Sequence, residues 1–107
     1  MTRESFAAMK PGAYLINTAR AAGIDQTALL EALRDQRIAG VALDVFWYEP
    51  IPANHPLLSM ENVVLTPHLG GAAEEVAERH SRMIVDDVFA WLDGNKPRNL
   101  FNPAVLS

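Results

Sequence analysis

Apolar residues along this chain form short runs that alternate with segments of helical periodicity. Three apolar runs have the length of buried strands, at residues 13–16, 39–43 and 63–65. Helical spacing or capping signals mark the segments around them, over residues 3–9, 26–37 and 72–92. This alternation predicts an α/β fold with about three parallel strands, right-handed crossovers and flanking helices.

Capping residues and prolines separate these elements. Thr2 and Asp25 are suited to cap the first two helices, and Gly94 is suited to end the third. One face of the third helix follows the i, i+3, i+4, i+7 spacing and consists of Ala73, Val76, Ala77, His80, Met83, Ile84, Val88, Trp91 and Leu92. Residues 45–62 contain three prolines and no clear periodicity, which predicts a long ordered loop. The tail, residues 95–107, is predicted to be extended.

Three strands make a small sheet. The faces of parallel sheets are normally covered on both sides, and the sheet is flanked by further strands. An isolated piece of this size would leave strand edges and apolar surface exposed. We therefore expect that these 107 residues evolved inside a larger domain.

Composition and charge narrow the classes of partner. Nine Lys and Arg against thirteen Asp and Glu give a net charge of −4 without a basic cluster, so nucleic acid is not expected as a partner. The apolar runs are far shorter than the roughly 20 residues that cross a bilayer, and the chain starts without the apolar core of a secretory signal. No membrane association is expected, and the predicted location is cytoplasmic. The chain has no cysteine, and His55 and His80 lack ligand partners, so no metal site is predicted.

A polar residue lies just beyond each predicted strand. Arg20, Asp44 and His68 follow the first, second and third apolar runs. Ligands bind outside the carboxyl ends of the strands in an open parallel sheet. These three side chains are therefore expected to meet at one crevice, which is the candidate site.

Five segments of the sequence resemble one family of enzymes. They are Met9-Lys10-Pro11-Gly12-Ala13, Asn17-Thr18-Ala19-Arg20, Ala42-Leu43-Asp44-Val45-Phe46, Glu49-Pro50 and Leu65-Thr66-Pro67-His68-Leu69-Gly70-Gly71. In this order and spacing they are similar to the D-isomer-specific 2-hydroxyacid dehydrogenases, which include D-3-phosphoglycerate dehydrogenase and glyoxylate/hydroxypyruvate reductase. The resemblance covers nearly the whole chain. It implies that residues 1–107 are the second half of a Rossmann-like, doubly wound dinucleotide-binding domain, with the substrate domain absent.

The resemblance implies a catalytic triad of Arg20, Glu49 and His68. Arg20 would grip the substrate carboxylate with its planar fork of donors. His68 would act as general acid and base while hydride passes between the nicotinamide of NAD or NADP and a small 2-hydroxy or 2-oxo acid. Glu49 would orient the imidazole and favour its protonated form. The competing interpretation of each is an ordinary surface or loop residue.

The resemblance also implies contacts with the nicotinamide cofactor, by Thr18, Ala19, Arg20, Asp44, His68, Gly70 and Gly71. Two glycines before a helix are also typical of a plain turn. Trp47 and Tyr48 either wall the substrate pocket or pack the loop onto the sheet. The complete enzyme is expected to be a homodimer.

Two departures from the family pattern change the picture. No G-x-G-x-x-G occurs, so the pyrophosphate-binding turn is missing and the choice between NAD and NADP stays open, as do the substrate and the physiological direction. Ala21 stands where the family usually has glycine, and a positive φ there would be strained. We expect the 107 residues to be inactive alone. The alternative is a non-catalytic dehydrogenase-like binding module or a truncated remnant.

Overall fold

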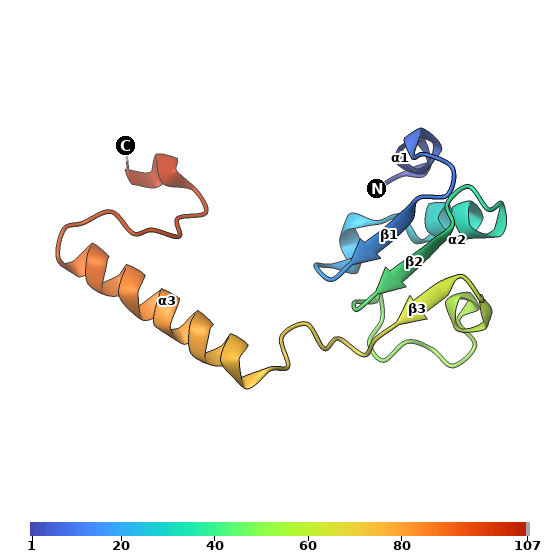
Figure 1. The fold of residues 1–107 in the computed structure, drawn as a ribbon. Coiled ribbons are helices and arrows are strands. Elements are labelled where there is room, and N and C mark those ends of the chain that lie inside the picture. Colours follow the sequence, from blue (N-terminus) through green and yellow to red (C-terminus); the bar gives the residue numbers. More distant parts are fainter. Residues whose placement is uncertain (107) are drawn as a thin grey trace. The chain divides into compact units, whose positions relative to one another are not determined.

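The computed structural model describes residues 1–106, which fall into two compact units (Figure 1). The first unit is Met1–Gly70, and the second begins at Gly71. The first holds the predicted sheet and every candidate site residue except Gly71, and each unit is described by itself below. No helix among the described residues is long and apolar enough to cross a bilayer.

The sheet of the first unit has three parallel strands, as the sequence predicts. β1 (Tyr14–Asn17), β2 (Gly40–Leu43) and β3 (Val63–Leu65) lie side by side in the order β1-β2-β3. β1 and β2 start one residue later than the apolar runs indicated, and β3 has the predicted bounds. Gly40 opens β2 because a Cβ there would come within 2.5 Å of the Asn62 carbonyl oxygen. The α/β prediction is confirmed.

Two helices build the core of the first unit. α1 (Arg3–Ala8) and α2 (Gln26–Arg34) pack against each other. The core is aliphatic apart from one aromatic ring, and its most deeply buried side chains are Phe6, Leu29, Ile38, Leu43, Val45 and Leu57. Burial of this kind is the main favourable term in folding. It fixes the strands from which the site loops emerge.

Two expectations about this unit need correction. α2 ends at Arg34 instead of residue 37, because Gln36 takes a left-handed conformation (φ 52°) and its N–H donates to the Leu33 carbonyl. The N–H of Arg37 closes the same cap on Ala32. The loop after β2 is also less irregular than predicted, since it contains a 3-10 turn, η2 (Pro56–Ser59).

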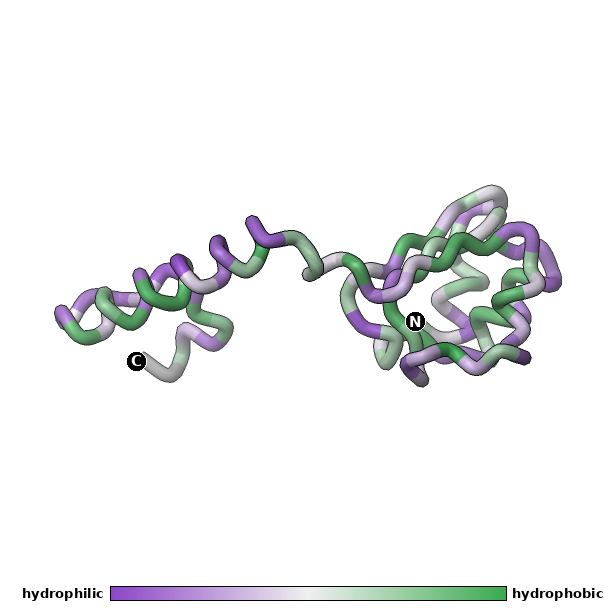
Figure 2. The backbone as a smooth tube through the Cα atoms, turned by 90° about the horizontal axis from the view of Figure 1, so that it is seen from below, coloured by the Kyte–Doolittle hydropathy of each residue, from purple (hydrophilic) through white to green (hydrophobic). Residues whose placement is uncertain are grey.

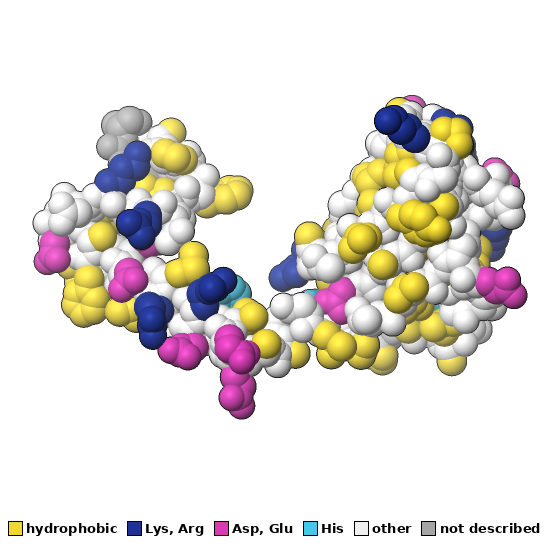
Figure 3. Space-filling model, viewed as in Figure 1, with side chains coloured by type: hydrophobic (Ala, Val, Ile, Leu, Met, Phe, Trp, Pro, Cys, Tyr) yellow, Lys and Arg dark blue, Asp and Glu magenta, His cyan; other side chains and the backbone are white. Residues whose placement is uncertain are grey.

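One face of the sheet carries exposed apolar side chains. Tyr14, Ile16 and Val64 are 73%, 72% and 64% exposed, and Ile16 and Val64 flank the same residue of β2 in the strand register. Hydrophobic side chains gather over the strands in Figure 3. This agrees with the expectation that so small a sheet leaves apolar surface uncovered.

The second unit consists of α3 (Glu74–Leu92) and the segment that follows it. The helix starts two residues later than predicted, and Gly94 (φ 75°) lies just past its end as expected. Hydrophobic and hydrophilic residues alternate along it in Figure 2, but none of its residues is buried. The tail is not fully extended: Asp87 accepts the N–H groups of Arg98 and Asn99, and a 3-10 turn, η3 (Pro103–Leu106), follows.

Candidate active site

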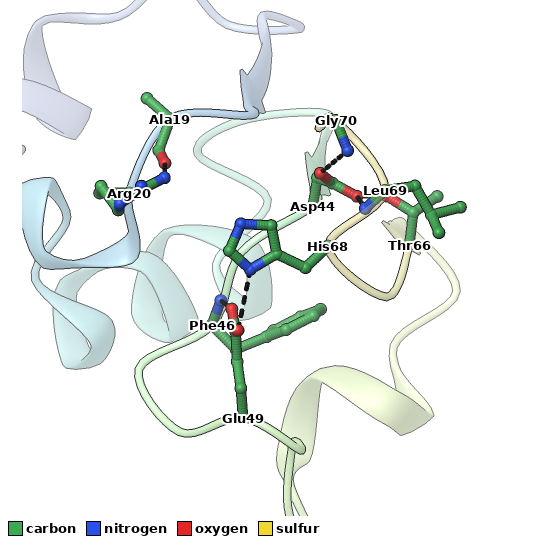
Figure 4. A network of polar contacts seen from close by, with 9 residues as sticks. All are labelled: Ala19, Arg20, Asp44, Phe46, Glu49, Thr66, His68, Leu69 and Gly70. Carbon is green, nitrogen blue, oxygen red and sulfur yellow. Dashed lines mark hydrogen bonds and ion pairs between the residues drawn. The ribbon is translucent and has the colours of Figure 1, made fainter. Parts of the chain in front are cut away.

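The candidate residues of the first unit come together beyond the carboxyl ends of the three strands (Figure 4). Arg20 follows β1, Asp44 follows β2, and His68 follows β3. The last residues of the strands, Asn17, Leu43 and Leu65, are aligned by the register, so the loops leave the sheet at one edge. The three positions therefore lie at one edge of the sheet, and their role as a ligand site stays a prediction.

His68 and Glu49 form a hydrogen-bonded pair within this site. Nδ1 of the imidazole lies 2.8 Å from Oε2 of the carboxylate, and Oε1 accepts the N–H of Phe46 at 3.0 Å. The hydrogen bond from His68 lowers the pKa of Glu49 most, followed by the Phe46 N–H, and the Arg20 charge adds to the effect. Nδ1 faces a carboxylate and therefore carries hydrogen, which leaves Nε2 as the nitrogen that can exchange a proton with a substrate.

Asp44 holds the loop that carries His68. Its side chain is buried, and its carboxylate accepts three hydrogen bonds, from the Thr66 hydroxyl at 2.5 Å, the Leu69 N–H at 2.7 Å and the Gly70 N–H at 2.8 Å. The Thr66 bond is the largest cause of the lowered pKa of Asp44, and the Leu69 bond comes next. We call these contacts the Asp44 clamp. It joins the end of β2 to both sides of His68.

The backbone of His68 lies in the left-handed region, at φ 55°. A residue with a Cβ pays roughly 1–2 kcal/mol for this conformation. The Asp44 clamp holds Thr66 before it and Leu69 after it, and the His68 N–H donates to the Thr66 carbonyl at 2.9 Å. Such strain persists where the surroundings over-determine it, which is common at functional sites.

Arg20 lies across from the imidazole on an exposed loop. Its Nη1 donates to the Ala19 carbonyl at 2.7 Å, and the guanidinium turns toward that oxygen in Figure 4. Asn17 braces the loop by donating to the Arg20 carbonyl and accepting the Ala19 N–H. The other guanidinium donors make no hydrogen bond to residues 1–106.

The alanine after Arg20 does not distort the loop. Ala21 is buried and starts a 3-10 turn, η1 (Ala21–Gly23), while Arg20 itself is extended (φ −150°, ψ 138°). Among the described residues, the only positive φ values outside glycine belong to Gln36 and His68. The strain that a glycine-requiring turn would impose on Ala21 is therefore absent there.

The remaining candidates are more loosely placed. Thr18 and Ala19 are exposed beside Arg20, Gly70 belongs to the Asp44 clamp, and Gly71 starts the second unit. The Thr66 hydroxyl and the Phe46 N–H have hydrogen-bonding roles that the sequence did not predict. A threonine two residues before the histidine was the available signal, whereas a main-chain donor leaves none.

Comparison with known proteins adds a family to this geometry. Residues 1–70 match the model of the D-isomer specific 2-hydroxyacid dehydrogenase NAD binding domain. Glyoxylate reductase of Thermofilum pendens is 45% identical over 106 residues, which cover 99% of this chain and 31% of that protein. Glyoxylate/hydroxypyruvate reductase B of Pectobacterium carotovorum is 46% identical over 104 residues, which cover 97% and 32%. The chain thus spans about a third of the length of these curated relatives.

Solved structures agree. A D-isomer specific 2-hydroxyacid dehydrogenase from Xanthobacter autotrophicus, in complex with NADPH and MES, matches 98% of this chain and 43% of its own with a TM-score of 0.80 and 37% identity. The NADPH-dependent glyoxylate/hydroxypyruvate reductase of Sinorhizobium meliloti, with NADP and malonate, matches 85% of this chain and 28% of its own with a TM-score of 0.68 and 38% identity. The partial Rossmann-like fold is confirmed.

Proposed function

Because this chain belongs to the D-isomer specific 2-hydroxyacid dehydrogenase family, we propose that Arg20, Glu49 and His68 form the catalytic set of an NAD(P)-dependent 2-hydroxyacid dehydrogenase. The observation that carries the proposal is the hydrogen bond between His68 and Glu49, with Arg20 nearby. Only one guanidinium nitrogen of Arg20, Nη1, is engaged within the described residues. These three groups suit a substrate that has a carboxylate beside a carbonyl or hydroxyl carbon. Small 2-oxo acids have this form.

Each residue has a separate task in the proposed reaction. Arg20 binds the substrate carboxylate through paired N–H donors. His68 donates the proton on Nε2 to the carbonyl oxygen of a 2-oxo acid as C2 receives hydride and the carbonyl π electrons move to that oxygen. Glu49 stays ionised, since its pKa is lowered, and its charge stabilises the imidazolium from which the proton leaves. In the oxidative direction neutral His68 takes the proton back.

The nicotinamide cofactor supplies or accepts the hydride when it is bound. The residues present fit its nicotinamide end, because the exposed main chain of residues 18–20 and of Gly70 lies at the strand ends where ligands of such sheets bind. The phosphate groups have no G-x-G-x-x-G turn here. We propose that residues 1–107 are the second half of the dinucleotide-binding domain, and that residues outside them bind the phosphates and complete the substrate pocket.

A second candidate is a dehydrogenase-like module that binds without catalysing. The complete polypeptide decides between the two. A reductase should oxidise NADH or NADPH with glyoxylate, hydroxypyruvate or pyruvate. A homodimer in the cytoplasm remains our expectation for that protein.

The sharpest test replaces the proton donor. Asparagine tolerates the left-handed backbone of position 68, so His68→Asn should keep the loop while removing the acid. In the complete enzyme kcat should fall by roughly 10²–10⁴-fold, the usual contribution of a general acid, and cofactor binding measured by calorimetry should persist. A loss below tenfold would assign proton transfer to another group.

A further inference from the structure

The loop that carries Glu49 is fastened to the rest of the first unit at two points. Before Glu49, the Trp47 Nε1–H donates to the Ile24 carbonyl at 3.0 Å. After it, Nε2 of His55 lies 2.5 Å from the side-chain amide of Gln26. Both contacts are at least partly buried, and both span more than twenty residues of sequence. Glu49 therefore lies on a loop that is fixed on each side.

The roles at the second contact follow from the histidine's other nitrogen. Nδ1 of His55 accepts the N–H of Leu57 at 3.3 Å, and this bond caps η2. A nitrogen that accepts carries no hydrogen, so Nε2 of the neutral ring carries it and can donate to the Gln26 amide only through the amide oxygen. The ring thus bridges the start of η2 and the start of α2.

The two points of attachment, Ile24 and Gln26, lie two residues apart on a segment fixed by hydrogen bonds. Ile24 is buried, and its N–H donates to Ala21 at 2.9 Å. Asp25 caps α2 by accepting the Ala28 N–H at 2.9 Å, and Gln26 is the first residue of that helix. Residues 24–26 follow directly from the 3-10 turn that Arg20 precedes. The Glu49 loop is therefore attached to the segment that positions Arg20.

This attachment matters because Arg20 and the Glu49–His68 pair have no direct bond. Arg20 donates to the Ala19 carbonyl, and Glu49 is engaged by Phe46 and His68. A 2-oxo acid presents its carboxylate and its carbonyl oxygen at a fixed separation, and small errors in such spacing cost rate. The fold must therefore set the distance between the Arg20 guanidinium, which binds the carboxylate, and the His68 imidazole, which donates the proton.

We propose that Trp47, with His55 as its second anchor, is a positioning residue that holds the Glu49 loop on the Arg20 segment and so sets the spacing of the substrate site. The inference rests on the proposed function. The simpler view is that Trp47 only packs, since its ring does contact the hydrophobic core. An indole N–H needs a partner when buried, so the bond to Ile24 alone does not separate the two views.

Removal of the N–H does separate them. Trp47→Phe keeps an aromatic ring and loses the donor. Ser59→Ala is the matched control, because it also removes one side-chain bond to a carbonyl of this loop, but a local one, to Pro56 at 3.0 Å. Gln26→Ala removes the second anchor from outside the loop and serves if Trp47→Phe does not fold. All are made in the complete enzyme and assayed with glyoxylate.

Two readouts are expected to move together. Trp47→Phe should lower kcat/KM for glyoxylate about three- to tenfold, the size of one lost hydrogen bond, while KM for the cofactor stays unchanged. The pKa of Glu49, followed by carboxyl carbon NMR, should rise toward its ordinary 4.5 as the pair with His68 loosens. Gln26→Ala should change both in the same direction, and Ser59→Ala should change neither.

The opposite pattern overturns the proposal. If Trp47→Phe lowers the unfolding temperature but leaves kcat/KM and the Glu49 titration in place, Trp47 only packs. The same holds if Ser59→Ala matches its effects. Failure of the proposed function has a different signature: the parent protein would reduce no 2-oxo acid, while the Glu49 titrations of parent and variant would still decide whether Trp47 positions the loop.

Discussion

At the scale of single residues, the imidazole of His68 is controlled by two carboxylates that act on different parts of it. Glu49 bonds the ring nitrogen Nδ1, whereas Asp44 never touches the ring and holds the backbone on each side of it. One carboxylate therefore orients the ring, and the other holds the backbone that carries it. Substitution of each should give separable results.

Glu49→Gln should change the acid side of the pH dependence of the proposed reaction. The pKa of Glu49 is lowered, first by the hydrogen bond from His68, so the parent keeps an ionised carboxylate on the ring until the pH falls through that lowered value. An amide does not titrate, so the loss of activity that follows protonation of Glu49 should be absent from the variant. Rate profiles of parent and variant in mild acid measure this. The same acid limb in both proteins would show that Glu49 does not hold the ring.

Asp44→Asn should loosen the loop instead. An amide has one acceptor oxygen and would turn an N–H₂ donor toward main-chain donors, so hydrogen exchange at Leu69 and Gly70 should quicken. Asp87→Asn is the control, since Asp87 also accepts two main-chain N–H groups but lies in the second unit. Equal exchange in parent and Asp44→Asn would argue against the clamp.

The lowered pKa of Asp44 gives the clamp a pH range. A carboxylate whose pKa is depressed on folding contributes stability that is fully present above its unfolded value, near 3.8, and is lost as pH falls through the folded value. In the parent, protection of the Gly70 N–H against exchange, measured relative to its intrinsic rate at each pH, should therefore persist above about pH 4 and be lost only in stronger acid. Loss of protection that begins near neutral pH would contradict this.

Some of these residues could be predicted from the sequence and others could not. Position at a strand end is a local signal, and each of Arg20, Asp44 and His68 was predicted because it follows an apolar run. The partners of Asp44 lie more than twenty residues away and two of them are main-chain groups. Trp47 was ambiguous for the same reason. Its carbonyl partner has no side-chain signature.

At the scale of elements, strand positions were predicted to within a residue, whereas the end of α2 and the start of α3 were not. The strands are short, buried segments whose hydrophobicity defines them. The end of α2 depends on Gln36, which adopts a conformation usually given to glycine. The 3-10 turn η2 was missed because His55 caps it with a ring nitrogen, outside the usual capping residues.

The end of α2 offers a stability test. Gln36→Gly should raise the free energy of unfolding by about 0.5–1 kcal/mol. Glycine adopts φ 52° without the Cβ penalty. The greater conformational entropy of glycine in the unfolded chain offsets part of this stabilisation. Asp35→Gly should destabilise, because Asp35 has φ −79° and gains nothing from glycine. Urea unfolding measures both. Destabilisation by Gln36→Gly would mean that its side chain matters more than its backbone.

At the scale of the whole molecule, the exposed apolar surface sets the behaviour of the chain by itself. Tyr14, Ile16 and Val64 are largely exposed on one face of the sheet. Contiguous apolar surface of this kind favours association. The 107 residues should self-associate in sedimentation experiments, and Ile16→Lys should weaken that association. A parent that stays monomeric at high concentration would contradict this.

The same chain should bind NADH weakly and reduce nothing, because the phosphate-binding turn is absent while the catalytic set is present. Calorimetry with NADH and an assay with glyoxylate measure this. Saturable reduction by the 107 residues would refute it and would also remove the need for the missing half.

The Asp44 clamp binds the His68 loop largely through main-chain groups, and this affects which substitutions the loop can accept. Asp44 binds Leu69 only by its main-chain N–H, and the Leu69 side chain is left 54% exposed. Any amino acid except proline supplies that N–H. Mutation can therefore change the side chain that follows the proton donor and leave the donor where it stands. Variation at this position and preservation of the chemistry need not compete.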